Sequence, residues 1–160
     1  MEPWQLESTI RQTQLILTNY RRWFGEHLIR VDGDRLEQAK ILFESPFVVF
    51  SHGTEADPIY NYGSRLGLEL WERTWEELTQ MPSRQSAAAE EQAQQERYAA
   101  LVDSRNYGCK RDFSAVRVTK SGRPVRIENV KLYDLLDASG EYRGQAAVFS
   151  KWTFLDEITQ

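Results

Sequence analysis

GRPVRIENVKLYDLLDASGEYRGQAAVFSKWTF, residues 122–154, is the stretch that decides the fold. Within it, residues 124–136 and 141–155 carry apolar side chains at about every second position, which is the period of a β-strand. The sequence DASG between them is a turn. Just upstream, residues 113–119 alternate in the same way and reach residue 124 through a turn at Gly122. Three strands joined by short turns pair antiparallel, so we predict a meander.

Two details of this meander follow from its phase. The inward-facing positions slip between Ile127 and Val130, which predicts a β-bulge near Glu128 and Asn129. The final segment is predicted to be one long strand. Alternation along it predicts a shared face for Tyr142, Gly144, Ala146, Val148, Ser150 and Trp152.

The first half of the chain adds short strands and helices. Residues 47–52 and 59–62 are β-rich, whereas residues 35–43 and 64–81 have helical spacing. Residues 83–105 have high helix propensity and few large apolar side chains, so they form a surface helix or are disordered at their start. The two early strands can join the meander in one sheet with helices packed on it, which is an α+β fold.

The first thirty residues carry a wide apolar stripe on a helix that nothing interrupts before Gly25. This stripe must be buried against its own domain or against a second copy of the chain. We therefore name as a candidate dimer face Leu6, Ile10, Leu17, Tyr20, Trp23 and Phe24.

The composition limits the class of protein. The chain has 160 residues, 41% hydrophobic and 28% charged, which fits one globular domain. A net charge of −4 argues against a nucleic-acid partner. The single cysteine excludes a disulfide within the chain and a four-cysteine zinc site. With neither a signal peptide nor a long apolar run, we expect a cytoplasmic protein without membrane contact.

Several separated strings carry a family resemblance: PFVVFSHG, DPIYNYG, LWE, PSR, SGRPVRIEN and GQAAVFSKWTF. Together and in this order they resemble the MEKHLA domain, a PAS-like family found as stand-alone bacterial proteins, notably cyanobacterial ones. The resemblance implies a five-stranded antiparallel sheet with helices on one face. It places the PAS-like domain at residues 45–160. Residues 1–44 are then a helical extension that forms one structural unit with it.

The resemblance implies a sensory, regulatory or interaction module and supplies no catalytic activity. The chain departs from many PAS domains at Gly63, where they have an asparagine after the second strand. That departure puts in doubt any ligand contact made by such an asparagine.

Candidate chemistry is sparse. Ser51 and His52 are neighbours on a strand and should point to opposite faces, so we predict no catalytic residues there. His52 either faces the helices, where it would bind a ligand or a haem iron, or is a satisfied core residue. No His or Cys spacing predicts a metal site. Cys109 lies just before the meander, away from the position at which flavin-adduct relatives carry their cysteine. The cofactor is therefore unknown.

Aromatic side chains from the predicted sheet and helices either fill the core or line a pocket. The candidate pocket residues are Phe50, His52, Tyr60, Trp71 and Trp152. We interpret the chain as a non-enzymatic sensory or interaction module that forms a homodimer through its first helix. Further candidate partners are an unidentified protein and a small apolar ligand. The alternative is a ligand carrier or small enzyme, for which Glu128 is the one candidate acid.

Overall fold

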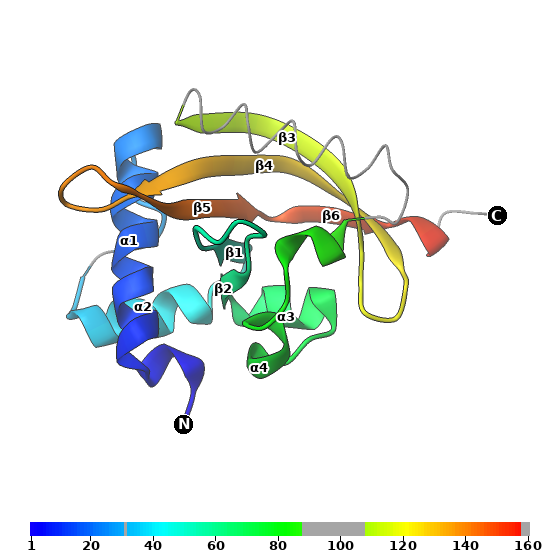
Figure 1. The fold of residues 1–160 in the computed structure, drawn as a ribbon, viewed down its shortest axis with the longest axis horizontal. Coiled ribbons are helices and arrows are strands. Elements are labelled where there is room, and N and C mark those ends of the chain that lie inside the picture. Colours follow the sequence, from blue (N-terminus) through cyan, green and yellow to red (C-terminus); the bar gives the residue numbers. More distant parts are fainter. Residues whose placement is uncertain (31, 88–107, 158–160) are drawn as a thin grey trace.

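The computed structural model describes residues 1–30, 32–87 and 108–157 (Figure 1). Its helices are α1 (Glu7–Phe24), α2 (Arg35–Phe43), α3 (Arg65–Trp71) and α4 (Trp75–Leu78). Its strands are β1 (Val48–His52), β2 (Tyr60–Gly63), β3 (Cys109–Val118), β4 (Pro124–Leu136), β5 (Tyr142–Phe149) and β6 (Lys151–Phe154). Short 3-10 helices are η1 (Pro3–Gln5), η2 (Ser83–Ser86) and η3 (Leu155–Glu157). Most of the helix predicted over 83–105 lies outside the described residues.

The helices begin and end where local chemistry directs them. α1 ends at Gly25, which adopts the left-handed conformation with φ of 77° that glycine accepts without strain. Asp34 caps α2 by accepting a hydrogen bond from the Glu37 backbone N–H. The helical segment predicted over 64–81 is divided into α3 and α4 because Glu72 is left-handed, with φ of 63°.

The strands form one antiparallel sheet in the order β2-β1-β5-β4-β3, with β6 beside β4. The predicted α+β fold and antiparallel meander are confirmed. The predicted β-bulge is also present. Phe113 on β3 pairs with Val130 on β4, and Ala115 pairs with Ile127. The paired residues are two positions apart on β3 and three apart on β4, so β4 contains one extra residue. Asn129, inside the bulge, has a positive φ of 55°.

The prediction for the last strand was wrong in one respect. The chain leaves strand geometry at Ser150, so β5 and β6 are separate strands that both pair with β4. The side-chain phase changes across this break. Ala146 and Val148 face one side of the sheet, whereas Trp152 packs on the other side with Phe149.

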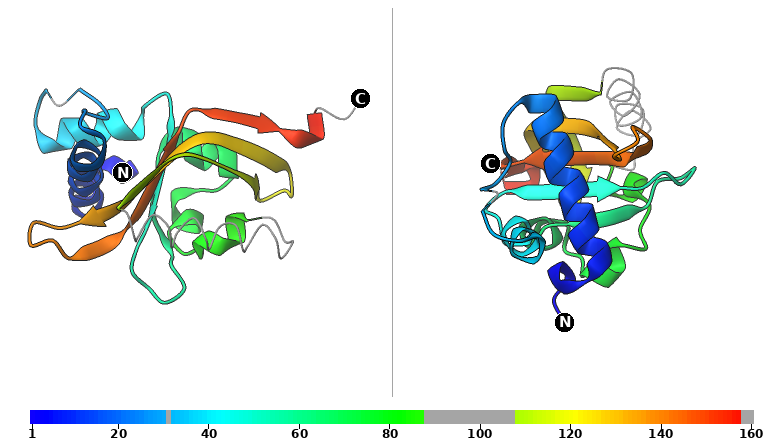
Figure 2. Two further views of the ribbon diagram at one scale, coloured as in Figure 1. Left: turned by 90° about the horizontal axis from the view of Figure 1, so that it is seen from above. Right: turned by 90° about the vertical axis from the view of Figure 1, so that its left-hand side faces the viewer.

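Helices cover both faces of the sheet (Figure 2). α3 and α4 lie on one face, where the residues that we call the α3-side core are Val48, Phe50, Tyr60, Leu70, Trp71, Leu78, Met81, Ala115, Val125, Ile127, Val130, Leu132 and Phe149. α1 and α2 lie on the other face. There the α1-side core consists of Ile16, Leu17, Tyr20, Ile29, Leu42, Val49, Tyr62, Tyr133, Leu135, Ala146 and Val148.

The apolar stripe of α1 is therefore buried against the sheet of its own chain. Ile10, Leu17 and Tyr20 are each exposed by less than a tenth, and Trp23 and Phe24 are half-buried. Leu6, at the start of the helix, remains 38% exposed. No described helix is long and apolar enough to cross a membrane.

Hydrogen bonds to β4 fix the position of α1. The side-chain amide of Asn19 donates to the Leu136 carbonyl oxygen at 3.0 Å and accepts from the Leu136 N–H at 3.1 Å. One turn further along the helix, the Trp23 indole N–H donates to the Asp134 carbonyl oxygen at 2.8 Å. These bonds satisfy β4 backbone groups that the apolar helix would otherwise desolvate.

Tyr62 and Tyr133 are two fully buried phenols in the α1-side core. Burial raises the pKa of both hydroxyls, so both are neutral. The Tyr133 hydroxyl donates to the Ile16 carbonyl oxygen at 3.1 Å. The Tyr62 hydroxyl has no hydrogen-bond partner among the described residues. The two side chains thus differ in hydrogen bonding while sharing burial and location.

This difference predicts opposite responses to loss of the hydroxyl. Tyr133→Phe should lower the free energy of unfolding by about 1 kcal/mol, since it deletes a buried hydrogen bond. Tyr62→Phe should leave that free energy unchanged or raise it by up to about 1 kcal/mol, since it removes an unpaired polar group. Urea denaturation of both variants measures the difference. A larger loss for Tyr62→Phe than for Tyr133→Phe contradicts the prediction.

Candidate functional site

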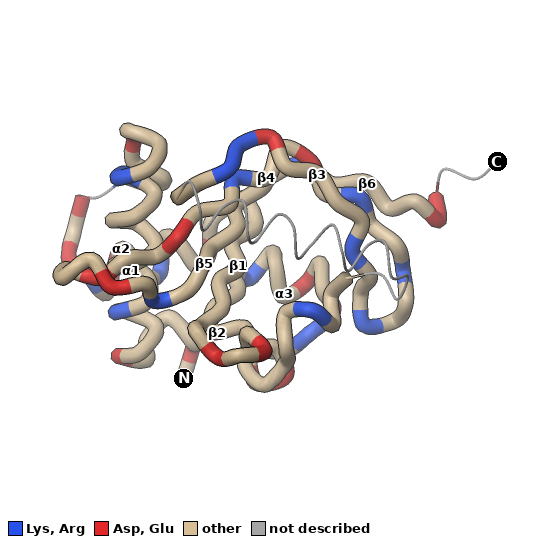
Figure 3. Tube along the Cα trace, turned by 45° about the horizontal axis from the view of Figure 1, so that its top comes forward, with Lys and Arg blue, Asp and Glu red and all other residues tan. Residues whose placement is uncertain are grey.

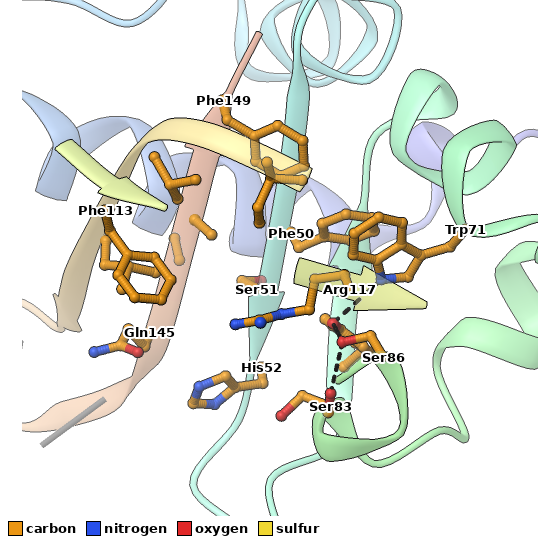
Figure 4. A pocket seen from close by; sticks show the side chains of 16 residues that line it. Phe50, Ser51, His52, Trp71, Ser83, Ser86, Phe113, Arg117, Gln145 and Phe149 are labelled. Atoms are coloured by element: carbon orange, nitrogen blue, oxygen red, sulfur yellow. Dashed lines mark hydrogen bonds between the residues drawn. The ribbon is translucent and has the colours of Figure 1, made fainter. Parts of the chain in front are cut away.

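A cavity of about 70 Å³ lies in the α3-side core, between the sheet and α3 (Figure 4). Of the five predicted pocket residues, four line it: Phe50, His52, Tyr60 and Trp71. The fifth, Trp152, lies one layer away, with its ring edge-on to Phe149 at 6.1 Å between centroids. The cavity is small beside the roughly 300–1,000 Å³ of a typical ligand pocket.

Cross-strand pairing builds a polar row at one end of the cavity. Gln145 on the central strand β5 pairs with His52 on β1 and with Asp134 on β4. Directly paired residues share a face of the sheet, so the three side chains stand side by side. All three are buried, with exposed fractions of 8%, 1% and 6% for His52, Gln145 and Asp134.

The next row along the strands is apolar and explains the hollow. Ala147 on β5 pairs with Phe50 on β1 and with Leu132 on β4. Its methyl group is much smaller than either neighbour. Although it stands in the middle of a covered sheet, Ala147 keeps intermediate exposure. The short side chain at this central position therefore leaves space that its larger neighbours do not fill.

Aromatic rings form the wall under α3. Phe50 stacks on Trp71 with ring centroids 4.7 Å apart and an interplanar angle of 25°. Gly67 permits this contact, since a Cβ there would lie 3.0 Å from the Phe50 ring. The Trp71 indole N–H donates to the Tyr60 hydroxyl at 3.3 Å. The same hydroxyl lies 2.9 Å from Ser86 Oγ, so the polar atoms of this wall are paired.

At the polar end, backbone contacts hold His52. Its Nδ1 lies 2.9 Å from the Gly53 carbonyl oxygen, so Nδ1 carries the proton that this oxygen accepts. Gly144 on β5 allows the strands to approach here. It has a positive φ of 127°, and a Cβ would stand 2.0 Å from the His52 carbonyl oxygen. No other residue fits at that position without moving a strand.

Ser51 and His52 point to opposite faces of the sheet, as predicted. Ser51 Oγ accepts from the Gln12 amide of α1 at 3.0 Å and donates to Asn61 Oδ1 at 2.6 Å. His52 lines the cavity on the other face. The pair therefore does not form a nucleophile with its base.

The remaining candidates lie away from the cavity. Cys109 packs against the α1-side core, on the opposite face of the sheet. Glu128 is partly exposed at the bulge, 3.9 Å from Lys151 Nζ. Among the described residues, no three His, Cys, Asp or Glu side chains are grouped to hold a metal ion.

Sequence reasoning missed Gln145, Asp134 and Ala147. They belong to the site because of strand register, and register between strands far apart in sequence cannot be read from their alternation alone. One signal was present: Gln145 and Asp134 are polar residues inside strands whose neighbouring residues are mostly apolar.

Comparison with solved structures places the fold. The PAS domain of a protein from Colwellia psychrerythraea aligns with a TM-score of 0.62 at 13% identity, covering 78% of this chain and 99% of that one. A light-oxygen-voltage domain studied with a flavin analogue aligns with a TM-score of 0.56 at 15% identity, covering 79% of this chain and 89% of that one. The light-state dimer of the fungal photoreceptor Vivid aligns with a TM-score of 0.56 at 11% identity, covering 82% of this chain and 88% of that one. At these identities the likeness shows a shared fold.

Family membership comes from the sequence itself. No curated protein matches the chain. The model of the MEKHLA domain, however, matches residues 10–154, from the first turn of α1 to the end of β6. The matched region contains the sheet, the cavity and the helices on both faces. The chain belongs to the MEKHLA domain family and has a PAS-like fold.

Proposed function

We propose that the chain is a non-enzymatic sensory or regulatory module whose signal is a small molecule bound in the cavity. The observation that carries this proposal is the cavity itself, with a buried polar row at one end and aromatic rings at the other. That arrangement suits binding: apolar walls supply affinity and a few polar groups orient the ligand.

A flavin does not fit this cavity. One neighbour in structure is a light-oxygen-voltage domain studied with a flavin analogue. Here the space is about 70 Å³, and the stacked Phe50 and Trp71 rings occupy the wall beside it. Cys109 lies on the other face of the sheet. The same lack of space argues against a haem bound through His52.

Two hydrogen bonds to a single residue, Asp134, link the cavity to α1. Asp134 turns its side chain to the polar row, where its Oδ1 lies 3.4 Å from Gln145 Nε2. Its carbonyl oxygen accepts the Trp23 indole hydrogen bond on the other face of the sheet. We infer that a ligand that shifts Gln145 changes the position of α1 on the sheet. This change in position would pass the signal to a partner protein.

One test of the proposal concerns the hollow at Ala147. Ala147→Val should raise the free energy of unfolding by about 1.6 kcal/mol, because valine adds two carbon groups and burying each is worth about 0.8 kcal/mol. The matched control is Ala146→Val, which adds the same atoms to the packed α1-side core, where Ala146 is 1% exposed. It should lower the free energy by about 1–3 kcal/mol. Denaturation curves of both variants measure these changes. An equal loss of unfolding free energy in Ala147→Val and Ala146→Val would contradict an open cavity.

Another test of the proposal concerns binding. A library of small aromatic fragments, screened against the full chain by two-dimensional NMR, should give hits that shift amides of β1, β4 and β5. Ala147→Val should weaken these hits at least tenfold, because its side chain occupies their space. Variants that leave the cavity open, such as Ser8→Ala on the exposed start of α1, should bind as the parent does. A library without hits contradicts the proposed function.

We also propose a site for self-association. Most of the predicted dimer face is buried inside the chain, so the exposed start of α1 is what remains for a contact with a second copy. Leu6 precedes α1 and Leu36 lies at the start of α2, and they are 38% and 45% exposed. The Glu7–Arg35 ion pair, at 3.5 Å, holds the two helices together beside them. A second copy would cover this apolar surface.

Sedimentation velocity tests this contact. If the chain dimerises through this surface, Leu6→Glu combined with Leu36→Glu should shift it to monomer without lowering the unfolding temperature. Ser8→Glu, a charge added at a nearby exposed position, should have little effect. A parent chain that stays monomeric at high concentration rules the contact out. A dimer that survives the double substitution assigns self-association to other residues.

Partners other than a second copy remain predictions. Figure 3 shows Asp and Glu spread over the described chain, whereas Lys and Arg also gather at the hairpin between β3 and β4. Many of these charges are paired on the surface, for example Arg84 with Asp57 at 2.9 Å and Arg123 with Asp156 at 2.9 Å. This pairing and the net charge of −4 argue against a nucleic-acid partner.

A further inference from the structure

We propose that the ligand is a single-ring heteroaromatic molecule whose ring N–H donates a hydrogen bond to Gln145 Oε1. This inference rests on the proposed function and names the class of molecule that the cavity would take. It is carried by an unpaired acceptor at one end of the cavity, an apolar slot beside it, and the size of the space between them.

The acceptor is the side-chain oxygen of Gln145. The residue is 1% exposed, and its Oε1 has no hydrogen-bond partner among the described residues. Figure 4 shows the side chain among those that line the cavity, with the oxygen on the side of His52 and Arg117. A buried carbonyl oxygen without a hydrogen bond costs free energy. A ligand donor that pairs with this oxygen therefore gains more binding free energy than one that pairs with a solvent-exposed oxygen.

The orientation of this amide is fixed by its neighbour. Gln145 Nε2 donates a hydrogen bond to Asp134 Oδ1 at 3.4 Å. The other polar atom of the amide, Oε1, is therefore on the side away from Asp134. Gln145 therefore presents Oε1 to the cavity, and the ligand must bring a donor to it.

The apolar slot lies one row further along the strands. Ala147 forms its floor, between Phe50 and Leu132, and Phe149 borders it. Alternate residues of a strand are about 6.6 Å apart, so a ring over Ala147 lies within one ring's length of the Gln145 amide. The stacked Phe50 and Trp71 rings make one wall flat, which favours a planar ligand.

The volume limits the ligand to one small ring. The cavity has about 70 Å³, about half of the roughly 150 Å³ engineered cavity that binds benzene. We therefore take the smallest aromatic ring, which has five members. Pyrrole meets the requirement, since it is flat, apolar and carries one ring N–H. Furan has the same shape with an oxygen in place of that N–H, so it is the matched control ligand.

The experiment titrates the full chain with pyrrole and with furan, following amide shifts of β1, β4 and β5 by two-dimensional NMR. We expect pyrrole to bind at least tenfold more tightly than furan. Gln145→Leu removes the acceptor and should bring the two affinities to within about twofold. Ser8→Ala, on the exposed start of α1 and outside the cavity lining, should preserve the preference for pyrrole.

A further measurement needs no variant and therefore does not depend on how Gln145→Leu folds. N-methylpyrrole has lost the donor, so its affinity for the parent chain should fall to that of furan or below. Equal binding of pyrrole and furan overturns the inference. So does an absence of pyrrole binding while other fragments bind in the cavity, and both results leave the proposed function standing. If no fragment of any kind binds, the proposed function fails as well.

Discussion

The structure depends on the register of β5, which is paired on both sides along most of its length. Its pairing with β1 and β4 decides which of its residues face each helical layer. Gln145, Ala147 and Phe149 turn to α3, whereas Ala146 and Val148 turn to α1. A slip by one residue would exchange the two sets. It would bring a glutamine into the core under α1 and close the cavity on the other face.

Much of the fold was predictable because its signals are local. Alternation predicted the meander, the phase slip at Ile127 and Val130 predicted the bulge, and Gly25 marked the end of α1. The break at Ser150 was missed, because an interruption of one residue leaves most of the alternation intact. The division at Glu72 was missed for a related reason, since a left-handed residue other than glycine carries no composition signal.

The candidate site was predictable only in part. Apolar and aromatic members such as Phe50 and Trp71 follow from composition and helical spacing, since large rings near a sheet belong to the core. The polar row does not, because Gln145, His52 and Asp134 come together through the register of three strands. The hollow at Ala147 is harder still to predict. An alanine marks a cavity only where its neighbours, here Phe50 and Leu132, fail to fill the space it leaves.

The contact between α1 and β4 also affects how the chain folds. The hydrogen bonds from Asn19 and from the Tyr133 hydroxyl each join residues 117 positions apart. Contacts this distant in sequence are slow to form, because the loop between them must close first. During synthesis α1 leaves the ribosome long before β4 exists. Its apolar stripe is exposed until the sheet forms, and a chaperone that binds amphipathic helices would protect the nascent chain at that stage.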